Sequence, residues 1–179
     1  MKPPVLQSER LRLRPYSWRD LSSVFDLCSR FETSRYSLWE PHKNYWDTLQ
    51  YLFFVKYRSA GIHWLCENEK GEIIGSCSFV TIDWEKEEGE IGYSVHPDYW
   101  HLGLGGEIAE TLLEYGFSAL MLKKIFARIM PQNVRSVALV KRLGMKPAER
   151  EEKPVVYKGV QKEIIRLEIS DKDYSLSRS

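Results

Sequence analysis

The sequence predicts one mixed α/β domain built around a mostly antiparallel sheet. Three strand-like segments separated by turns follow one another between residues 62 and 95, which is the pattern of an antiparallel meander. A long amphipathic helix comes next, because apolar residues recur at three- and four-residue steps from Ile108 to Leu120. The 179 residues fit one domain, and no repeat or flexible linker divides them. We expect the domain to span residues 1–170, with residues 171–179 as a frayed polar tail.

The N-terminal third is predicted to hold one strand and two helices. Polar and apolar residues alternate over residues 10–14, as they do in a half-buried strand. Ser17 followed by Asp20 resembles the N-terminal cap of a helix. A second helix is predicted to begin near Asn44, and the segment between the two helices, residues 33–42, is expected to be a loop or a short irregular helix.

The remaining elements are predicted from their periodicity and their turn residues. Strands are expected at residues 62–67, 72–82, 90–95 and 124–130. A helix over residues 133–143 should end at Gly144. Residues 146–157 and 160–169 are predicted to form a hairpin that turns at Lys158-Gly159.

Composition and charge exclude several classes of protein. Apolar residues make up 43% of the chain and charged residues 28%, so the chain is not of the disordered type. The net charge of +1 provides no broad field for nucleic acid or an anionic membrane, so any anion site must be local. No apolar run is long enough to span a bilayer and no secretory signal is recognisable, so we expect a cytoplasmic protein.

Cysteine and histidine spacing indicates neither disulfides nor a metal site. The three cysteines lack CxxC spacing, and we expect them to be reduced and structural: Cys28, Cys66 and Cys77. The four histidines have no metal-ligand spacing, so no metal is expected: His42, His63, His96 and His101. The GxSxG motif of a serine nucleophile is also absent.

A glycine-rich loop precedes the long helix and indicates a site for phosphate. Unpaired N–H groups point outwards from the first turn of a helix, and glycines let an anion approach them closely. The spacing Gly103-x-Gly105-Gly106 differs from the dinucleotide-binding fingerprint, and no Lys-Ser/Thr pair follows it as in a P-loop. A tight turn without a ligand would explain the glycines equally well.

Three ordered blocks over about residues 5–169 together resemble the GNAT acetyltransferase superfamily. The first matches the glycines of that family's signature Gln/Arg-x-x-Gly-x-Gly/Ala, with Trp100 in place of the usual Gln or Arg: Trp100-His101-Leu102-Gly103-Leu104-Gly105. The second is similar to the family's Asn-containing helix: Asn133-x-x-Ser136 through Leu143-Gly144-Met145. The third looks like the branch of ribosomal-protein N-terminal and polyamine acetyltransferases: Glu9–Pro15, Thr33–Tyr36 and Trp39–His42.

This resemblance implies a GNAT fold and acetyl-CoA as co-substrate. The implied sheet has about six to seven strands, flanked by about four helices, and its fourth and fifth strands splay apart to receive the pantetheine arm. The resemblance assigns the free backbone groups of the fourth strand to Tyr93, Ser94 and Val95, and the pantetheine amides to Asn133. The diphosphate would bind backbone N–H groups of Trp100, His101, Leu102, Gly103, Leu104, Gly105 and Gly106.

The implied reaction is direct attack of a primary amine on the thioester. Glu90 is the candidate base and His96 its competitor, while the backbone N–H of Val95 is the candidate oxyanion donor. The family's usual tyrosine position holds Val140, so Ser136 becomes the candidate proton donor to the leaving thiolate. Ser136 as an ordinary hydroxyl on a helix surface remains an equal alternative.

An α-amine is the favoured acceptor, because about a tenth of such groups are neutral at pH 7 against less than a thousandth of lysine-type amines. The leading hypothesis is therefore acetylation of a protein or peptide N-terminus. The alternatives are a small-molecule amine, such as a polyamine or antibiotic, or a non-catalytic acyl-CoA sensor. Nucleic acid and membrane partners are not expected. The sequence does not determine the oligomeric state, and a homodimer is possible.

The aromatic residues of the N-terminal region would either line a pocket or fill the core: Tyr36, Trp39, Tyr45 and Trp46.

Overall fold

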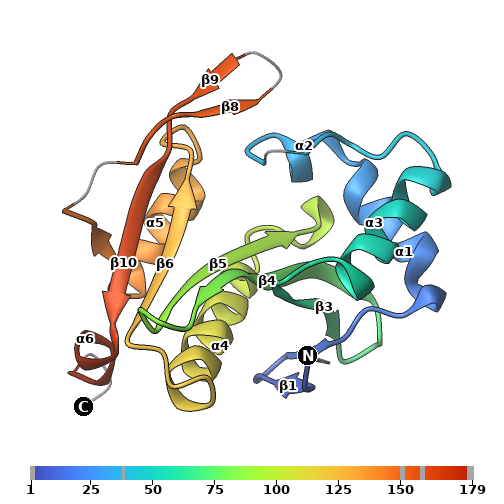
Figure 1. Cartoon of the computed structure of the whole chain (residues 1–179). Helices are drawn as coiled ribbons and strands as arrows, with labels where there is room; N and C mark the ends of the chain where they lie inside the picture. Colours follow the sequence, from blue (N-terminus) through green and yellow to red (C-terminus); the bar gives the residue numbers. More distant parts are fainter. Residues whose placement is uncertain (1–2, 38, 150–151, 158–159, 177–179) are drawn as a thin grey trace.

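The computed structural model of the chain describes residues 3–37, 39–149, 152–157 and 160–176. Within them, an eight-stranded sheet has the order β1-β2-β3-β4-β5-β6-β10-β7 (Figure 1). Its strands are β1 (Leu6–Gln7), β2 (Leu11–Arg14), β3 (Ile62–Asn68), β4 (Ile73–Asp83), β5 (Glu88–Val95), β6 (Lys124–Ile129), β7 (Lys146–Pro147) and β10 (Ile165–Ser170). All neighbours pair antiparallel except β5 and β6, which confirms the predicted mixed α/β class. The strand count exceeds the prediction because two-residue strands at the sheet edges carry no periodic signal.

Six α-helices flank the described part of the sheet. They are α1 (Leu21–Ser29), α2 (Phe31–Ser34), α3 (Tyr45–Tyr57), α4 (Leu104–Ser118), α5 (Val134–Arg142) and α6 (Asp171–Leu176). Two short 3-10 helices, η1 (Trp18–Asp20) and η2 (Pro97–Tyr99), precede α1 and α4. The four longest, α1, α3, α4 and α5, are those predicted from the sequence. The one-turn helix α2 lies partly within the segment expected to be irregular.

The predicted starts of the N-terminal helices are confirmed by their caps. At η1, the Asp20 carboxylate accepts a hydrogen bond from the Ser17 N–H at 2.7 Å, and Ser17 Oγ accepts one from Arg19 N at 3.3 Å. At α3, Asn44 Oδ1 accepts hydrogen bonds from the N–H groups of the first turn. Both caps are local in sequence, which is why the sequence identifies them.

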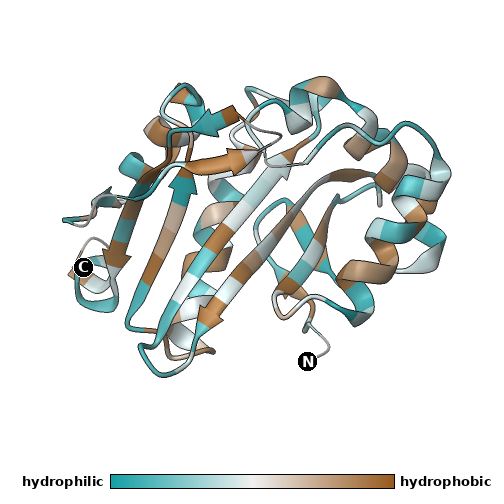
Figure 2. Cartoon of the chain, turned by 45° about the horizontal axis from the view of Figure 1, so that its top comes forward, coloured by the Kyte–Doolittle hydropathy of each residue, from teal (hydrophilic) through white to brown (hydrophobic). Residues whose placement is uncertain are grey.

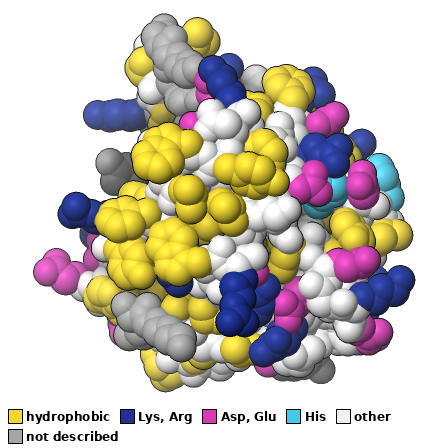
Figure 3. Space-filling model, turned by 90° about the vertical axis from the view of Figure 1, so that its right-hand side faces the viewer, with side chains coloured by type: hydrophobic (Ala, Val, Ile, Leu, Met, Phe, Trp, Pro, Cys, Tyr) yellow, Lys and Arg dark blue, Asp and Glu magenta, His cyan; other side chains and the backbone are white. Residues whose placement is uncertain are grey.

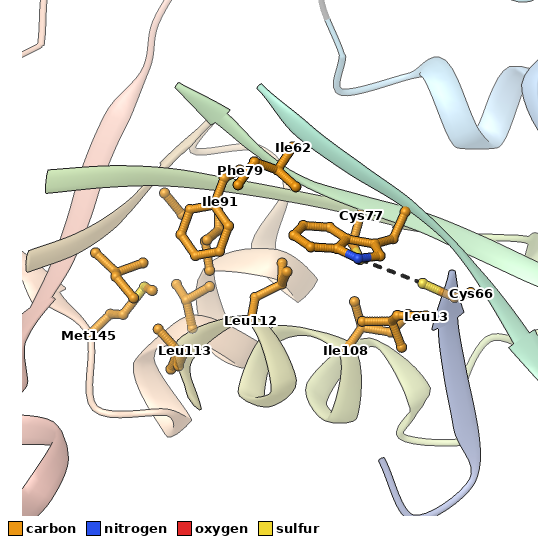
Figure 4. Close-up of a cluster of buried hydrophobic side chains, with 14 of the residues drawn as sticks. Leu13, Ile62, Cys66, Cys77, Phe79, Ile91, Ile108, Leu112, Leu113 and Met145 are labelled. Carbon is orange, nitrogen blue, oxygen red and sulfur yellow. Dashed lines mark hydrogen bonds between the residues drawn. The ribbon is translucent and has the colours of Figure 1, made fainter. Parts of the chain in front are cut away.

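The main core lies between the sheet and α4. One stripe of α4, including Ile108, Leu112 and Leu113, packs against strand residues such as Phe79 (Figure 4). Gly116 permits this close approach, because a Cβ there would lie 2.5 Å from Ile125 Cδ1. Polar and apolar residues alternate along the strands, so the sheet also has a more polar face (Figure 2).

The helices α1 and α3 cover part of the opposite face of the sheet, where Val24 and Leu52 pack on Leu65. Helix α3 is apolar on its outer side as well, so aromatic side chains gather on the face shown in Figure 3. Large exposed aromatic side chains of α3 are Tyr45, Trp46, Phe53, Phe54 and Tyr57. The three cysteines are buried and free, as predicted, and the sulfur atoms of Cys66 and Cys77 lie 3.7 Å apart.

The expected splay lies between β5 and β6. These strands pair only at Glu88↔Lys124, Gly89↔Ile125 and Glu90↔Phe126, and beyond Glu90 they diverge (Figure 1). The second half of β5 is therefore paired with β4 on one side and open on the other.

The C-terminal region differs from its prediction. The long hairpin is reduced to the short strands β8 (Val155–Tyr157) and β9 (Val160–Lys162), and its turn at residues 158–159 lies outside the described residues. Strand β10 pairs instead with β6 and β7. The segment expected to be frayed begins with α6, because the Ser170 hydroxyl accepts a hydrogen bond from the Asp173 N–H at 3.1 Å and so caps the turn.

Candidate active site

A cavity of about 1070 Å³ lies where β5 and β6 separate. It is bounded by the second half of β5, the start of α4, α5 and the segment around α2. It brings together residues predicted as a site from three separate stretches of sequence: Glu90, Tyr93, Ser94, Val95, Trp100, His101, Gly103, Leu104, Gly105, Gly106, Asn133 and Ser136. Leu102 is the predicted residue that does not line it. Its side chain is 54% exposed, and its carbonyl accepts a hydrogen bond from Arg10 Nη1.

The open edge of β5 presents the backbone groups of Tyr93 and Val95. Just after β5, the N–H of His96 donates to Ile74 O in β4. Because backbone groups alternate in direction along an antiparallel strand, Ser94 also faces β4, whereas Tyr93 and Val95 face the opening. The backbone groups of Ser94 are therefore not free as expected, although Ser94 lines the cavity.

The glycine-rich loop supplies a row of free N–H groups. Gly103 adopts a φ of 79°, which favours glycine, and α4 begins at the next residue. The N–H groups of residues 101–105 donate to no carbonyl in the described part of the chain. Two of the expected donors are already engaged, since Trp100 N donates to Pro97 O at 3.1 Å and Gly106 N to Gly103 O at 3.0 Å. The free row is therefore shorter than predicted.

Arg10 fixes this loop from the other end of the sequence. Its guanidinium donates to Leu102 O at 2.9 Å and to the carboxylate of Glu107 in α4 at 2.7 Å. Burial opposes ionisation of Glu107, but hydrogen bonds from Arg10 and Ser8 hold the pKa of its carboxyl below the usual value. These contacts could not be predicted from the sequence, because Arg10 and Glu107 are 97 positions apart.

The Trp100 side chain contacts both β5 and the guanidinium group of Arg135. Its indole Nε1 donates to Val95 O at 2.8 Å, which occupies one of the open backbone groups of β5. The Arg135 guanidinium carbon lies 5.0 Å from the centre of the Trp100 ring, a cation–π contact that joins α5 to the loop. Arg135 lines the cavity in the first turn of α5, where the helix dipole disfavours a cation. An anion in the cavity would offset this cost.

Two hydroxyl groups face each other between β5 and α5. The phenol oxygen of Tyr93 lies 3.0 Å from Ser136 Oγ. Burial raises the pKa of Tyr93, so the phenol keeps its proton at neutral pH. Asn133 caps α5 by accepting a hydrogen bond from the Ser136 N–H, which leaves its amide NH₂ available to a ligand. Val140, at the position considered for a tyrosine, is fully buried in the core.

Glu90 is buried and forms an ion pair that the sequence did not reveal. Its two carboxylate oxygens accept hydrogen bonds from Arg128 Nε and Nη2, both at 2.9 Å. The hydrogen bonds to Glu90 raise the pKa of the Arg128 guanidinium, so this residue stays charged. Thr81 Oγ1 lies 3.4 Å from Glu90 Oε2. The pair faces the cavity from β5 and β6.

The structure places His63, and not His96, at the lining of the cavity. His96 is buried and caps η2, and it does not line the cavity. His63 does line it, and burial lowers the pKa of its imidazole to about 4. The His63 Nε2 atom lies 2.6 Å from Ser59 Oγ.

Among the described residues, no cluster of three or more His, Cys, Asp or Glu side chains could hold a metal ion. No helix within the described ranges is long and apolar enough to cross a membrane.

The aromatic residues of the N-terminal region divide between two roles. Tyr36 and Trp39 line the cavity, and Trp39 also packs against the small core beside α1 and α3. Tyr45 and Trp46 are exposed and belong to neither the cavity nor the core.

Comparisons with known proteins agree on one family. The model of the acetyltransferase (GNAT) domain matches residues 10–146. An uncharacterised N-acetyltransferase, YoaA of Bacillus subtilis, is 30% identical over 79% of this chain and 82% of its own length. The spermidine N(1)-acetyltransferase of Escherichia coli is 25% identical over 75% of this chain and 72% of its own length.

Solved structures share the fold at lower identity. A GNAT-family acetyltransferase from Bacillus anthracis superposes with a TM-score of 0.83 at 20% identity, covering 94% of this chain and 99% of its own. The spermidine N-acetyltransferase of Vibrio cholerae, solved with CoA and spermine, has a TM-score of 0.79 at 21% identity and coverages of 92% and 98%. A putative ribosomal-protein-serine acetyltransferase from the same species has a TM-score of 0.81 at 18% identity and coverages of 95% and 99%.

Proposed function

The chain belongs to the GNAT acetyltransferase family, and from this premise we propose that it acetylates the α-amine of a protein or peptide N-terminus. Acetyl-CoA is the co-substrate of this family, and its acceptors are amines. The observation that carries the proposal is the open edge of β5, which leads directly to the free N–H groups before α4. A strand edge suits the amides of a pantetheine arm, and a helix start suits a diphosphate.

The cavity offers complementary groups along the length of acetyl-CoA. We assign the diphosphate to the N–H groups of residues 101–105, with Arg135 as an added cation. The backbone of Tyr93 and the amide of Asn133 would bind the pantetheine arm. The space next to Gly106 is open, because a Cβ there would meet no atom within 4 Å.

The reaction begins with a neutral amine that attacks the thioester carbonyl carbon. As the C–N bond forms, negative charge develops on the carbonyl oxygen, and the Val95 N–H at the open edge is the proposed donor to it. Glu90 is the proposed acceptor of the proton that the amine loses, directly or through water. Arg128 holds the Glu90 carboxylate at the cavity by two hydrogen bonds of 2.9 Å.

Collapse of the tetrahedral intermediate breaks the C–S bond and leaves the thiolate of CoA. The proposed proton donor is the Tyr93–Ser136 pair, in which one hydroxyl donates to sulfur and the other hydrogen-bonds to it. A phenol is a stronger acid than an alcohol, so Tyr93 strengthens the pair at a position where Ser136 alone would be a weak donor. Solvent then restores the proton. A thiolate with a pKa near 8.5 leaves without much assistance, so a modest donor suffices.

Acetylation of a polyamine is the second candidate. It is supported by the relatives that are named spermidine acetyltransferases, while the neighbour named as a putative ribosomal-protein-serine acetyltransferase supports the first candidate. The two differ in charge, since a polyamine keeps further ammonium groups when one amine reacts. Free carboxylates in the cavity would be required to bind them.

An acetyl-CoA turnover assay tests the proposal by following released thiol. The acceptor panel holds N-terminal peptides, the same peptides with a blocked α-amine and a free lysine, and spermidine. We expect turnover with free N-termini and little with blocked peptides. Turnover confined to spermidine would favour the second candidate, and tight binding of CoA without turnover of any amine would favour a sensor.

A further inference from the structure

The α2 side of the cavity holds a buried hydroxyl without a partner. Thr33 is 9% exposed and lines the cavity, and its Oγ1 makes no hydrogen bond with any described residue. The next hydroxyl of the same helix, Ser34 Oγ, donates to Phe31 O at 3.1 Å, so a hydroxyl in this helix can be satisfied locally. Burying a hydroxyl without a hydrogen-bond partner carries a free-energy cost. A polar group of a bound acceptor would offset this cost.

Arg35 provides a positive charge on the α2 side of the same cavity. It follows α2 directly, is exposed and lines the same cavity. Its guanidinium carbon lies 5.2 Å from the centre of the Tyr36 ring, and no carboxylate of the described residues forms an ion pair with it. Another arginine of the cavity lining, Arg128, is held by Glu90. Arg135 and Arg142 line the cavity from α5, so among the described residues Arg35 is the arginine on the α2 side.

The described carboxylates of the cavity do not suit a polyamine. They belong to Glu32 and Glu90, and both oxygens of Glu90 are bound by Arg128. Glu152 lies near enough to Arg128 to raise its pKa, so it too faces a cation. Of the described carboxylates, only Glu32 would then remain for the two ammonium groups that spermidine keeps when its third amine reacts, and Arg35 would repel them.

We propose that the acceptor carries a carboxylate close to its reacting amine, and that Arg35 and Thr33 Oγ1 bind this carboxylate. A guanidinium and a hydroxyl both donate hydrogen bonds to a carboxylate, and the aromatic walls of Tyr36 and Trp39 reduce the water that would screen the ion pair. An acidic residue near a peptide N-terminus and a free α-amino acid share this chemistry. The inference rests on the proposed acetyl transfer and specifies its acceptor.

Paired acceptors test the inference in the intact protein. We measure kcat/KM for a peptide with Asp at its second position, the same peptide with Asn there, free aspartate and spermidine. We expect the Asp peptide or aspartate to exceed the Asn peptide at least tenfold, and the better of the two identifies the source of the carboxylate. Arg35→Gln should abolish the difference and Arg35→Lys should keep part of it. Thr33→Val should raise KM for the carboxylate acceptor, and Thr33→Ser should restore it.

The outcomes separate this inference from the proposed function. Equal turnover of the Asp and Asn peptides, unchanged by Arg35→Gln, overturns the inference and leaves acetylation of N-termini in place. Spermidine as the preferred acceptor overturns both the inference and the peptide assignment, while acetyl transfer stands. If calorimetry shows no binding of acetyl-CoA, or no amine is acetylated, the proposed function fails and the inference fails with it.

Discussion

Tyr93 on β5 and Ser136 on α5 meet across the opened sheet, with their hydroxyl oxygens 3.0 Å apart. Both residues line the cavity. The contact between their hydroxyl groups could not be predicted from the sequence, because the two residues are 43 positions apart. The pair is the proposed proton donor beside the proposed path of the pantetheine arm, where position 140 holds no tyrosine.

This relationship predicts that Tyr93→Phe and Ser136→Ala both slow the chemical step. Each should lower kcat about tenfold or more, because general acid assistance is lost. Steady-state assays give kcat, and calorimetry should show nearly unchanged affinity for CoA. Tyr93→Phe keeps the ring that packs in the core, so it separates the hydroxyl from the fold. Full activity in both variants would remove the pair from the mechanism.

Gly106→Asp should prevent binding of CoA while leaving the fold intact. The new side chain enters open space but places a negative charge beside the proposed diphosphate. We expect a loss of affinity of about 100-fold or more, equivalent to about 2.7 kcal/mol. Gly106→Ala is the matched control and should bind CoA normally, because alanine favours the helix. Equal affinity of both variants, measured by calorimetry, would contradict the placement of the phosphates.

Arg135→Gln should weaken CoA binding by about tenfold, since a hydrogen bond to a charged group contributes about 1.5–3 kcal/mol. Arg135→Lys keeps the charge and should lose less. The weakening should be smaller at high salt, where exposed charges are screened. An Arg135→Gln variant that binds CoA as tightly as the wild type at low salt would show that Arg135 does not contribute to CoA binding.

Glu90→Gln should lower kcat/KM about 100-fold, because an amide cannot accept the proton of the amine. Thr81→Val is the control, since it removes the hydroxyl near Glu90 and leaves the pair with Arg128 intact. That variant should stay active. Activity of Glu90→Gln close to that of the wild type would assign the base to another group or to water.

The partly buried His63 predicts a loss of stability in mild acid. Its pKa is lowered to about 4 in the folded chain, against 6.5 for an unburied imidazole. The unfolded chain therefore takes up a proton first as the pH falls below about 6.5, which favours unfolding. Between pH 7 and 5 this effect should remove about 2 kcal/mol of the free energy of unfolding.

Denaturant titrations of the wild type and His63→Gln at several pH values measure this slope. The variant should show a shallower dependence on pH, whatever its stability at pH 7. Identical slopes would mean that His63 is protonated as readily in the folded chain as in the unfolded chain.

The sequence predicts the parts of the fold that depend on neighbours along the chain. Ser17 and Asn44 cap helices by bonds to the next two or three residues, and Gly103 marks the turn before α4 by its positive φ. The candidate phosphate site at the N–H groups before α4 was predicted from the same local pattern of glycines. Helix α6 was missed, since a one-turn cap at Ser170 resembles many polar turns.

The partners of the site residues depend on contacts between distant segments. Arg10 reaches Glu107, and Arg128 reaches Glu90, only because the sheet brings their strands and helices together. Charged residues are common at strand edges, so their type alone does not identify their partners. The exposed side of α3 could not be predicted either. A helix that is apolar on all sides lacks the hydrophobic periodicity that distinguishes its buried side from its exposed side.

A crystal structure of the protein with CoA tests the central claim most directly. We predict the diphosphate within hydrogen-bond distance of N–H groups in residues 101–105, and the pantetheine arm between β5 and β6. A nucleotide bound elsewhere, with these N–H groups turned away from it, would contradict the account.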